Sequence, residues 1–220
     1  MINFIKTKST LECEEKLYKT LKDNLENNKK VLLIIAGGSN IPILKTVFDQ
    51  LEFKLTSNID IILSDERFGP SDYQESNFVK LIKYGFDKKK ANFINILTNQ
   101  DIKTSTRLLE KEFVQKSQKV DIIIAQLGIG EDGHIAGILP NSKALDSNNY
   151  VVNFKGPDFE RITLSFKALK KIDIAIVAAY GAKKKKALKN LKNLKLPINE
   201  MPSRILQEIK SIYIYNDQLE

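Results

Sequence analysis

The only histidine of the chain, His134, lies in the stretch GIGEDGHIAGILP, which runs from Gly128 to Pro140. A histidine can accept a proton near neutral pH, which suits it to act as a general base. A nearby carboxylate, Asp132 or Glu131, could fix the tautomer of the ring and stabilise its protonated form. The stretch therefore contains a candidate acid–base pair, although a lone histidine is more often a structural or surface residue than a catalytic one.

The same stretch contains G-x-G-x-x-G in Gly128, Gly130 and Gly133, the spacing of a dinucleotide-binding fingerprint. That fingerprint also needs a full helix after the glycines, so that a pyrophosphate lies at the helix N-terminus. Here Gly137 weakens any helix that begins at the histidine, and Pro140 ends it after about two turns. The pattern therefore favours a sharp turn that presents the histidine over a nucleotide site.

A second glycine-rich loop, AGGSN at 36–40, has the composition of a phosphate cradle. Gly37 and Gly38 let backbone N–H groups approach an anion closely, and Ser39 adds a hydroxyl donor. The loop lacks the Lys-Ser/Thr pair of a Walker A motif. A tight turn that needs positive φ explains the two glycines equally well.

Charged side chains follow other strand-like segments. Asp65 and Arg67 come directly after an apolar run, where Asp65 could transfer or orient a proton and Arg67 could contact an anion. A solvated strand end is the alternative. Arg161 and Lys184 are two further cations suited to an anionic ligand. Of the four lysines at 183–186, we expect three to be solvated.

The composition limits the classes of function. The chain has 220 residues, a net charge of +8, four arginines and no tryptophan, which is not typical of a nucleic-acid reader. It has no apolar run of the ~20 residues that a membrane span needs. Its single cysteine, Cys13, and its lack of a signal peptide predict a cytoplasmic protein. One histidine and no cysteine pair do not favour a zinc site, and no obligate protein partner is evident.

Strand-like and helix-like patterns alternate along the whole chain. Strands are predicted at 2–6, 31–40, 59–67, 92–97, 120–130, 149–154, 161–166, 171–181 and 210–217, and helices at 9–28, 41–51, 74–85, 101–118, 182–193 and 202–209. Strands separated by such helices imply parallel pairing with crossovers, and we expect one α/β domain over 1–220. Because ligands bind beyond the carboxyl ends of such strands, the candidate loops should meet at one edge of the sheet.

The first predicted helix has a clear buried face. Cys13, Leu17, Leu21 and Leu25 recur at four-residue spacing, which places them on one side of the helix. Ser9 with Glu12 has the spacing of a capping box, which predicts that the helix begins at this point.

Five segments resemble one known family in order and approximate spacing: AGGSN, SDERFGPSDYQESNF, LGIGEDGHIAGILP, RITLSF and GAKKKKAL. The chain resembles the 6-phosphogluconolactonases, which belong to a wider group with glucosamine-6-phosphate deaminase/isomerase. The resemblance implies a Rossmann-like three-layer fold, with helices on both faces of a mostly parallel twisted sheet. It also implies hydrolysis of 6-phosphogluconolactone, a phosphorylated sugar lactone of the oxidative pentose phosphate pathway, without a metal or organic cofactor.

The resemblance also implies roles for individual residues. His134 would be the base for the attacking water, with Asp132 beside it. The proposed contacts to the sugar phosphate are Gly37, Gly38, Ser39, Asn40, Arg67, Arg161 and Lys184. Asn40 stands where the family usually has threonine, and its amide can still donate a hydrogen bond.

Two departures separate the branches of this group. The deaminase branch has a glutamate just before the proline that ends the histidine stretch, where this chain has Leu139, and it usually reads DEY where this chain has DER. Both favour a lactonase. Two alternatives stay open: an amino-sugar-phosphate isomerase/deaminase that uses Asp65 as its base, and a sugar-phosphate-binding protein without catalysis.

Overall fold

Strands and helices alternate along the computed structural model, which describes residues 2–97 and 99–219. The strands are β1 Ile2–Lys6, β2 Val31–Ile35, β3 Ile59–Leu63, β4 Asp65–Arg67, β5 Asn92–Ile94, β6 Ile122–Gly128, β7 Val151–Lys155, β8 Glu160–Leu164, β9 Ile174–Ala179 and β10 Ser211–Asn216. The α-helices are α1 Leu11–Glu26, α2 Ile41–Gln50, α3 Phe53–Thr56, α4 Asn77–Lys83, α5 Ile102–Lys119, α6 Phe166–Leu169 and α7 Lys185–Asn193. Short 3-10 helices cover Gly38–Asn40, Lys88–Lys90, Ala182–Lys184 and Pro202–Glu208.

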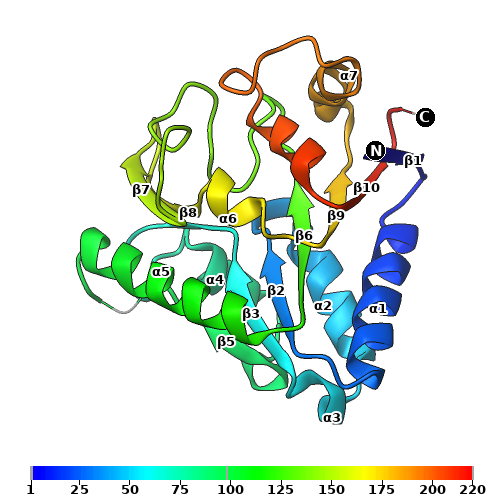
Figure 1. Cartoon of the computed structure of the whole chain (residues 1–220), viewed down its shortest axis with the longest axis vertical. Helices are drawn as coiled ribbons and strands as arrows, with labels where there is room; N and C mark the ends of the chain where they lie inside the picture. The colour runs from blue at the N-terminus through cyan, green and yellow to red at the C-terminus, as the bar shows by residue number, and fades with distance from the viewer. Residues whose placement is uncertain (1, 98, 220) are drawn as a thin grey trace.

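Seven strands form the central sheet in the order β1-β10-β9-β6-β2-β3-β5, and every neighbouring pair is parallel. All five residues of β2 are buried, as expected for a strand covered on both faces. The strand order and the right-handed crossover rule together imply that α1, α2 and α4 cover one face of the sheet and that α5 and α7 cover the other. Figure 1 shows α1 and α2 together on one side and α5 on the opposite side. The predicted α/β fold is confirmed.

Helix α1 packs as its pattern predicts, but it begins differently. Cys13, Leu17, Leu21 and Leu25 are all buried in the core. The predicted capping box of Ser9 and Glu12 is wrong, because the N-cap residue is Thr10 and its hydroxyl donates to the Glu14 carboxylate at 2.7 Å. The helix therefore begins two residues later than the predicted range, and the Ser9 hydroxyl accepts a hydrogen bond from the N–H of its first residue, Leu11, at 3.3 Å.

A second, antiparallel sheet has the strand order β4-β8-β7. The predicted single strand over 59–67 breaks at Ser64, whose N–H donates to the Ile35 carbonyl at 2.7 Å while its own carbonyl accepts from Leu164 N–H at 2.9 Å. Beyond this point β4 pairs with β8 instead of with the central sheet. The chain thereby carries Asp65 and Arg67 out over the carboxyl edge of the parallel strands.

The sequence contains no apolar run long enough for a membrane span, and the helices of the structure agree with this. None of the helices within 2–97 and 99–219 is long and apolar enough to cross a membrane.

Candidate active site

One cleft of about 330 Å³ gathers the predicted site residues at the carboxyl ends of the parallel strands. Nine of the ten line it: Gly37, Gly38, Ser39, Asn40, Asp65, Arg67, His134, Arg161 and Lys184. They come from segments that lie far apart in the sequence. The tenth, Asp132, does not line the cleft but is hydrogen-bonded to His134.

His134 and Asp132 form a hydrogen-bonded pair. The Asp132 carboxylate lies 2.7 Å from His134 Nδ1 and also accepts a hydrogen bond from the His134 backbone N–H at 3.1 Å. Partial burial raises the pKa of the Asp132 carboxyl, but the bond and charge of His134 outweigh it and bring that pKa down to about 2. With Nδ1 held by a carboxylate, Nε2 is the ring atom that can accept a proton.

The glycines of G-x-G-x-x-G make room for these side chains. A Cβ on Gly130 would lie 2.1 Å from His134 Nδ1 and 2.5 Å from the Asp132 carboxylate. A Cβ on Gly128 would lie 2.4 Å from the Asn40 side-chain nitrogen. No helix follows, since Ile135 forms isolated bridges with Ile129 and Ile138. The lack of a following helix and the φ of +87° at Gly133 agree with the expected sharp turn, and the close contacts of Gly128 and Gly130 are a further role of the motif.

The two glycines of the 36–40 loop have different structural roles. Gly38 has a φ of +61°, which explains one glycine as a turn residue. Gly37 instead lies against Asn77, because a Cβ there would be 2.2 Å from the Asn77 side chain. Asn77 was missed from the sequence. It lines the cleft and donates from its amide to the Asp65 carbonyl at 3.0 Å, which ties the loop to β4.

Glu66 was also missed, and it organises the turn between β4 and α4. It is fully buried and its carboxylate accepts four hydrogen bonds, from the Ser76 hydroxyl and from the backbone N–H groups of Arg67, Asn77 and Phe78. Burial raises the pKa of the Glu66 carboxyl to about 7, although the four hydrogen bonds act to lower it.

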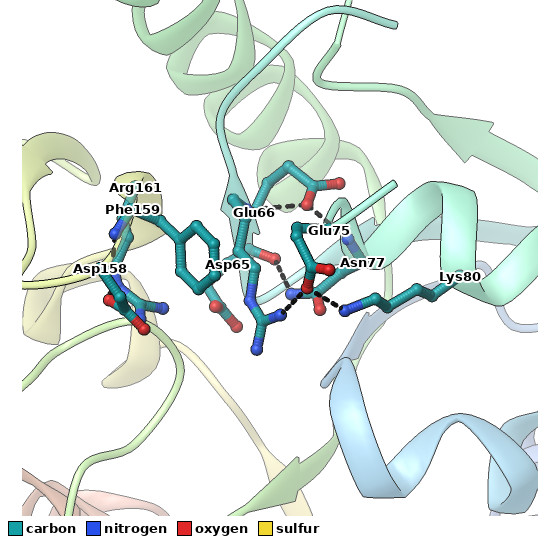
Figure 2. A network of polar contacts seen from close by, with 9 residues as sticks. Asp65, Glu66, Glu75, Asn77, Lys80, Asp158, Phe159 and Arg161 are labelled. Carbon is teal, nitrogen blue, oxygen red and sulfur yellow. Dashed lines mark hydrogen bonds and ion pairs between the residues drawn. The ribbon is translucent and has the colours of Figure 1, made fainter. Parts of the chain in front are cut away.

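Arg67 and Arg161 face each other in register across the β4–β8 pair. Their guanidinium carbons lie 4.7 Å and 5.6 Å from the centre of the Phe159 ring. Each arginine also has a carboxylate partner, Glu75 at 3.0 Å for Arg67 and Asp158 at 2.8 Å for Arg161. Figure 2 shows Phe159 between the Asp158 and Arg161 end of this network and its Glu75 and Lys80 end.

This network fixes two cations at the wall of the cleft. Like charges in register across strands repel each other, so a shared aromatic ring and separate carboxylates are needed to hold both. Phe159 and Asp158 lie in the turn between β7 and β8, and neither was predicted as a site residue. Only their contacts across the turn reveal them.

Lys184 is the one lysine of the 183–186 run that lines the cleft. The pKa of the Lys184 ammonium is lowered, because the effect of burial is larger than the opposing effect of the Glu131 and Asp132 carboxylates. Lys183, Lys185 and Lys186 are exposed, as predicted.

Asp65 and Leu139 differ in their position relative to the cleft. The Asp65 carboxylate accepts a hydrogen bond from the Ser64 hydroxyl at 3.0 Å and lines the cleft. Leu139 is absent from the described cleft lining and packs against the hydrophobic core. Within the described ranges, no group of three or more His, Cys, Asp or Glu side chains is arranged to hold a metal ion.

Comparison with known proteins matches residues 6–214 to the family model described as glucosamine-6-phosphate isomerases/6-phosphogluconolactonase. The 6-phosphogluconolactonase of Borreliella burgdorferi is 30% identical over 203 residues, which cover 87% of this chain and 85% of that protein. The glucosamine-6-phosphate deaminase of Lactobacillus johnsonii is 26% identical over 235 residues, covering 99% and 95%. The crystal structure of 6-phosphogluconolactonase from Thermotoga maritima superposes with a TM-score of 0.84 at 24% identity and covers 98% of both chains.

Proposed function

The chain belongs to the glucosamine-6-phosphate isomerase/6-phosphogluconolactonase family, and within it we propose that the chain hydrolyses 6-phospho-D-glucono-1,5-lactone to 6-phosphogluconate. One observation carries the proposal: the His134–Asp132 pair, joined at 2.7 Å, faces a cleft that is also lined by Arg67, Arg161 and Lys184. A base beside three cations fits an ester of a phosphorylated sugar. The reaction would belong to the oxidative pentose phosphate pathway.

In this mechanism His134 Nε2 removes a proton from water, and the water oxygen attacks the C1 carbonyl of the lactone. Asp132 stabilises the imidazolium that forms. Arg67 or the backbone N–H groups of the glycine loops stabilise the tetrahedral oxyanion. When the C1–O5 bond breaks, the imidazolium returns the proton to the O5 leaving group. Water is thereby divided between the new carboxylic acid and the new hydroxyl.

The phosphoryl group of the substrate would bind at the other side of the cleft. The proposed donors are the backbone of Gly37 and Gly38, the side chains of Ser39 and Asn40, and the cations Arg161 and Lys184. The helix α2 begins directly after this loop, so its N-terminus adds a favourable dipole.

Purified protein given freshly made 6-phosphogluconolactone is expected to release acid well above the uncatalysed rate. Because this lactone also hydrolyses spontaneously, the blank must be subtracted. Tight binding of 6-phosphogluconate by calorimetry together with no acceleration would instead identify a binding protein without catalysis.

The deaminase alternative has its own support, because the Lactobacillus johnsonii deaminase aligns over 99% of this chain. Leu139 argues against it, since an apolar side chain outside the cleft cannot assist His134 or Asp65 in proton transfer. We therefore expect no ammonia release when the protein is incubated with glucosamine-6-phosphate. Enzymatic ammonia production at a rate comparable to lactone hydrolysis would reverse the choice.

Arg161→Lys is expected to raise the KM for the lactone about tenfold or more, with little change in kcat. Lysine keeps the charge but loses the planar fork that reaches Asp158 and stacks on Phe159. Initial rates over a range of substrate concentrations measure the effect. Arg107→Lys, an exposed position on α5, is the matched control. An unchanged KM in Arg161→Lys would remove Arg161 from the substrate site.

A further inference from the structure

Gln126 is a polar residue inside an otherwise apolar strand. It lies in β6, is fully buried, and pairs in register with Ile35 of β2. Its side-chain nitrogen donates to Asn40 Oδ1 at 3.0 Å and lies 3.4 Å from the Leu127 carbonyl oxygen. Its own Oε1 is buried without a hydrogen-bond partner. An unpaired buried acceptor is destabilising, so packing alone does not explain a glutamine at this position.

The contacts of Gln126 decide which way the Asn40 amide points. A backbone carbonyl can only accept, so the Gln126 atom beside Leu127 O is the amide nitrogen. The Asn40 atom that meets this nitrogen must therefore be its oxygen. Asn40 Nδ2 is turned the other way, over Gly128, where a Cβ would lie only 2.4 Å from it.

This orientation leaves a donor directed at the cleft. Asn40 and Gly128 both line it, and no residue within the described ranges accepts a hydrogen bond from Asn40 Nδ2. Asn40 is also the residue directly before α2, beside Gly38 and Ser39. Its two amide hydrogens are therefore placed where the proposed function puts the phosphoryl oxygens.

We propose that Gln126 is a positioning residue that locks the Asn40 amide so that its N–H groups face a phosphoryl oxygen of the bound sugar phosphate. The inference rests on the proposed function, which places the phosphoryl group at the 36–40 loop. Without Gln126, the Asn40 amide can turn by 180° and present its oxygen to the anion. The ligand then loses a donor and meets a repelling acceptor.

Gln126→Leu tests this role. Leucine has a similar volume and removes both the unpaired Oε1 and the Nε2 donor of Gln126. We expect the KM for the lactone and the calorimetric Kd for 6-phosphogluconate to rise about 10- to 100-fold, in line with the loss of one hydrogen bond to a charged group. The value of kcat should stay within twofold, and the melting temperature should not fall. Gln126→Met is the second variant if leucine does not fold.

A double-mutant cycle separates positioning from packing. Asn40→Ala should weaken 6-phosphogluconate binding by itself, and Gln126→Leu should add nothing in that background. Asn40→Asp should weaken binding most, since it keeps an acceptor for Gln126 but replaces the donor with a negative charge. Ser105→Ala is the matched control, because it also removes a buried unpartnered polar atom but lies in α5, outside the cleft lining.

The outcomes divide clearly. Unchanged KM and Kd in Gln126→Leu, or a full additional loss in the Asn40→Ala background, would overturn the role of Gln126. If the wild-type protein binds 6-phosphogluconate but does not hydrolyse the lactone, the proposed catalysis fails while the Kd measurements still test the positioning. If the wild type does not bind 6-phosphogluconate, both the phosphate site and the inference built on it fail.

Discussion

His134→Ala is expected to slow enzymatic hydrolysis of 6-phosphogluconolactone by about 10²–10⁴-fold, the usual contribution of a general base. The physical reason is that the cleft offers one ring nitrogen, Nε2, whose partner Nδ1 is already held by Asp132 at 2.7 Å. Alanine leaves the attacking water without this proton acceptor. Stopped-flow or pH-indicator rates, corrected for the spontaneous reaction, measure the loss.

The His134→Ala variant should still fold and should still bind 6-phosphogluconate. His134 is a partly exposed side chain at the end of a loop, so its removal opens no cavity in the core. The Kd for 6-phosphogluconate and the melting temperature are therefore expected to stay near those of the wild type. Wild-type turnover in His134→Ala would show that another group activates the water.

Glu66→Gln is expected to lower the free energy of unfolding by about 2–3 kcal/mol, through the unmet hydrogen bonds of buried groups. The two oxygens of Glu66 accept from three backbone N–H groups and one hydroxyl. A glutamine NH₂ cannot accept, so at least one buried backbone N–H would face another donor. For a chain of this size the melting temperature should fall by about 5–10 °C.

The effect of Glu66→Gln should depend on pH in a defined direction. The pKa of the Glu66 carboxyl is raised from 4.5 to about 7 in the folded chain, so the folded state binds the proton more tightly than the unfolded state. The contribution of this group to stability is therefore full below about pH 4.5 and falls as the pH rises to about 7. Glutamine does not titrate in this range. The free energy of unfolding of the wild type should therefore exceed that of the variant by more at pH 5 than at pH 8.

Denaturant unfolding at the two pH values measures this difference. Glu200→Gln is the control, because it removes the same charge from an exposed position. Equal stability of Glu66→Gln and wild type at both pH values would contradict the role given to the four hydrogen bonds.

Much of the fold follows from local pattern, and the exceptions have physical causes. The apolar run Val31–Ile35 predicts a strand buried on both faces, and all five residues are buried. The break at Ser64 was not predictable, because the residues before and after it read as one continuous strand. It depends on a carbonyl of Ser64 that meets Leu164 N–H, a contact that only the assembled chain provides.

Some residues of the site could likewise be predicted from the sequence, and others could not. Polar, charged and glycine residues near strand ends, together with the family resemblance, predicted nine residues that the cleft brings together. Glu66, Asn77 and Phe159 were missed, because their importance lies in what they contact. Glu66 and Asn77 did have a signal, in the SN that follows DER by nine residues, but the sequence alone does not show that the two segments touch. Phe159 has no comparable signal.

The walls of the cleft come from separate stretches between Ala36 and Lys184, so the cleft exists only once these parts of the chain are in place. A ligand that needs all of them binds the native state and no partly folded form. It therefore acts on the kinetics of the chain in one direction: it slows unfolding and leaves the rate of folding unchanged. A saturating concentration of such a ligand should therefore lengthen the lifetime of the folded chain.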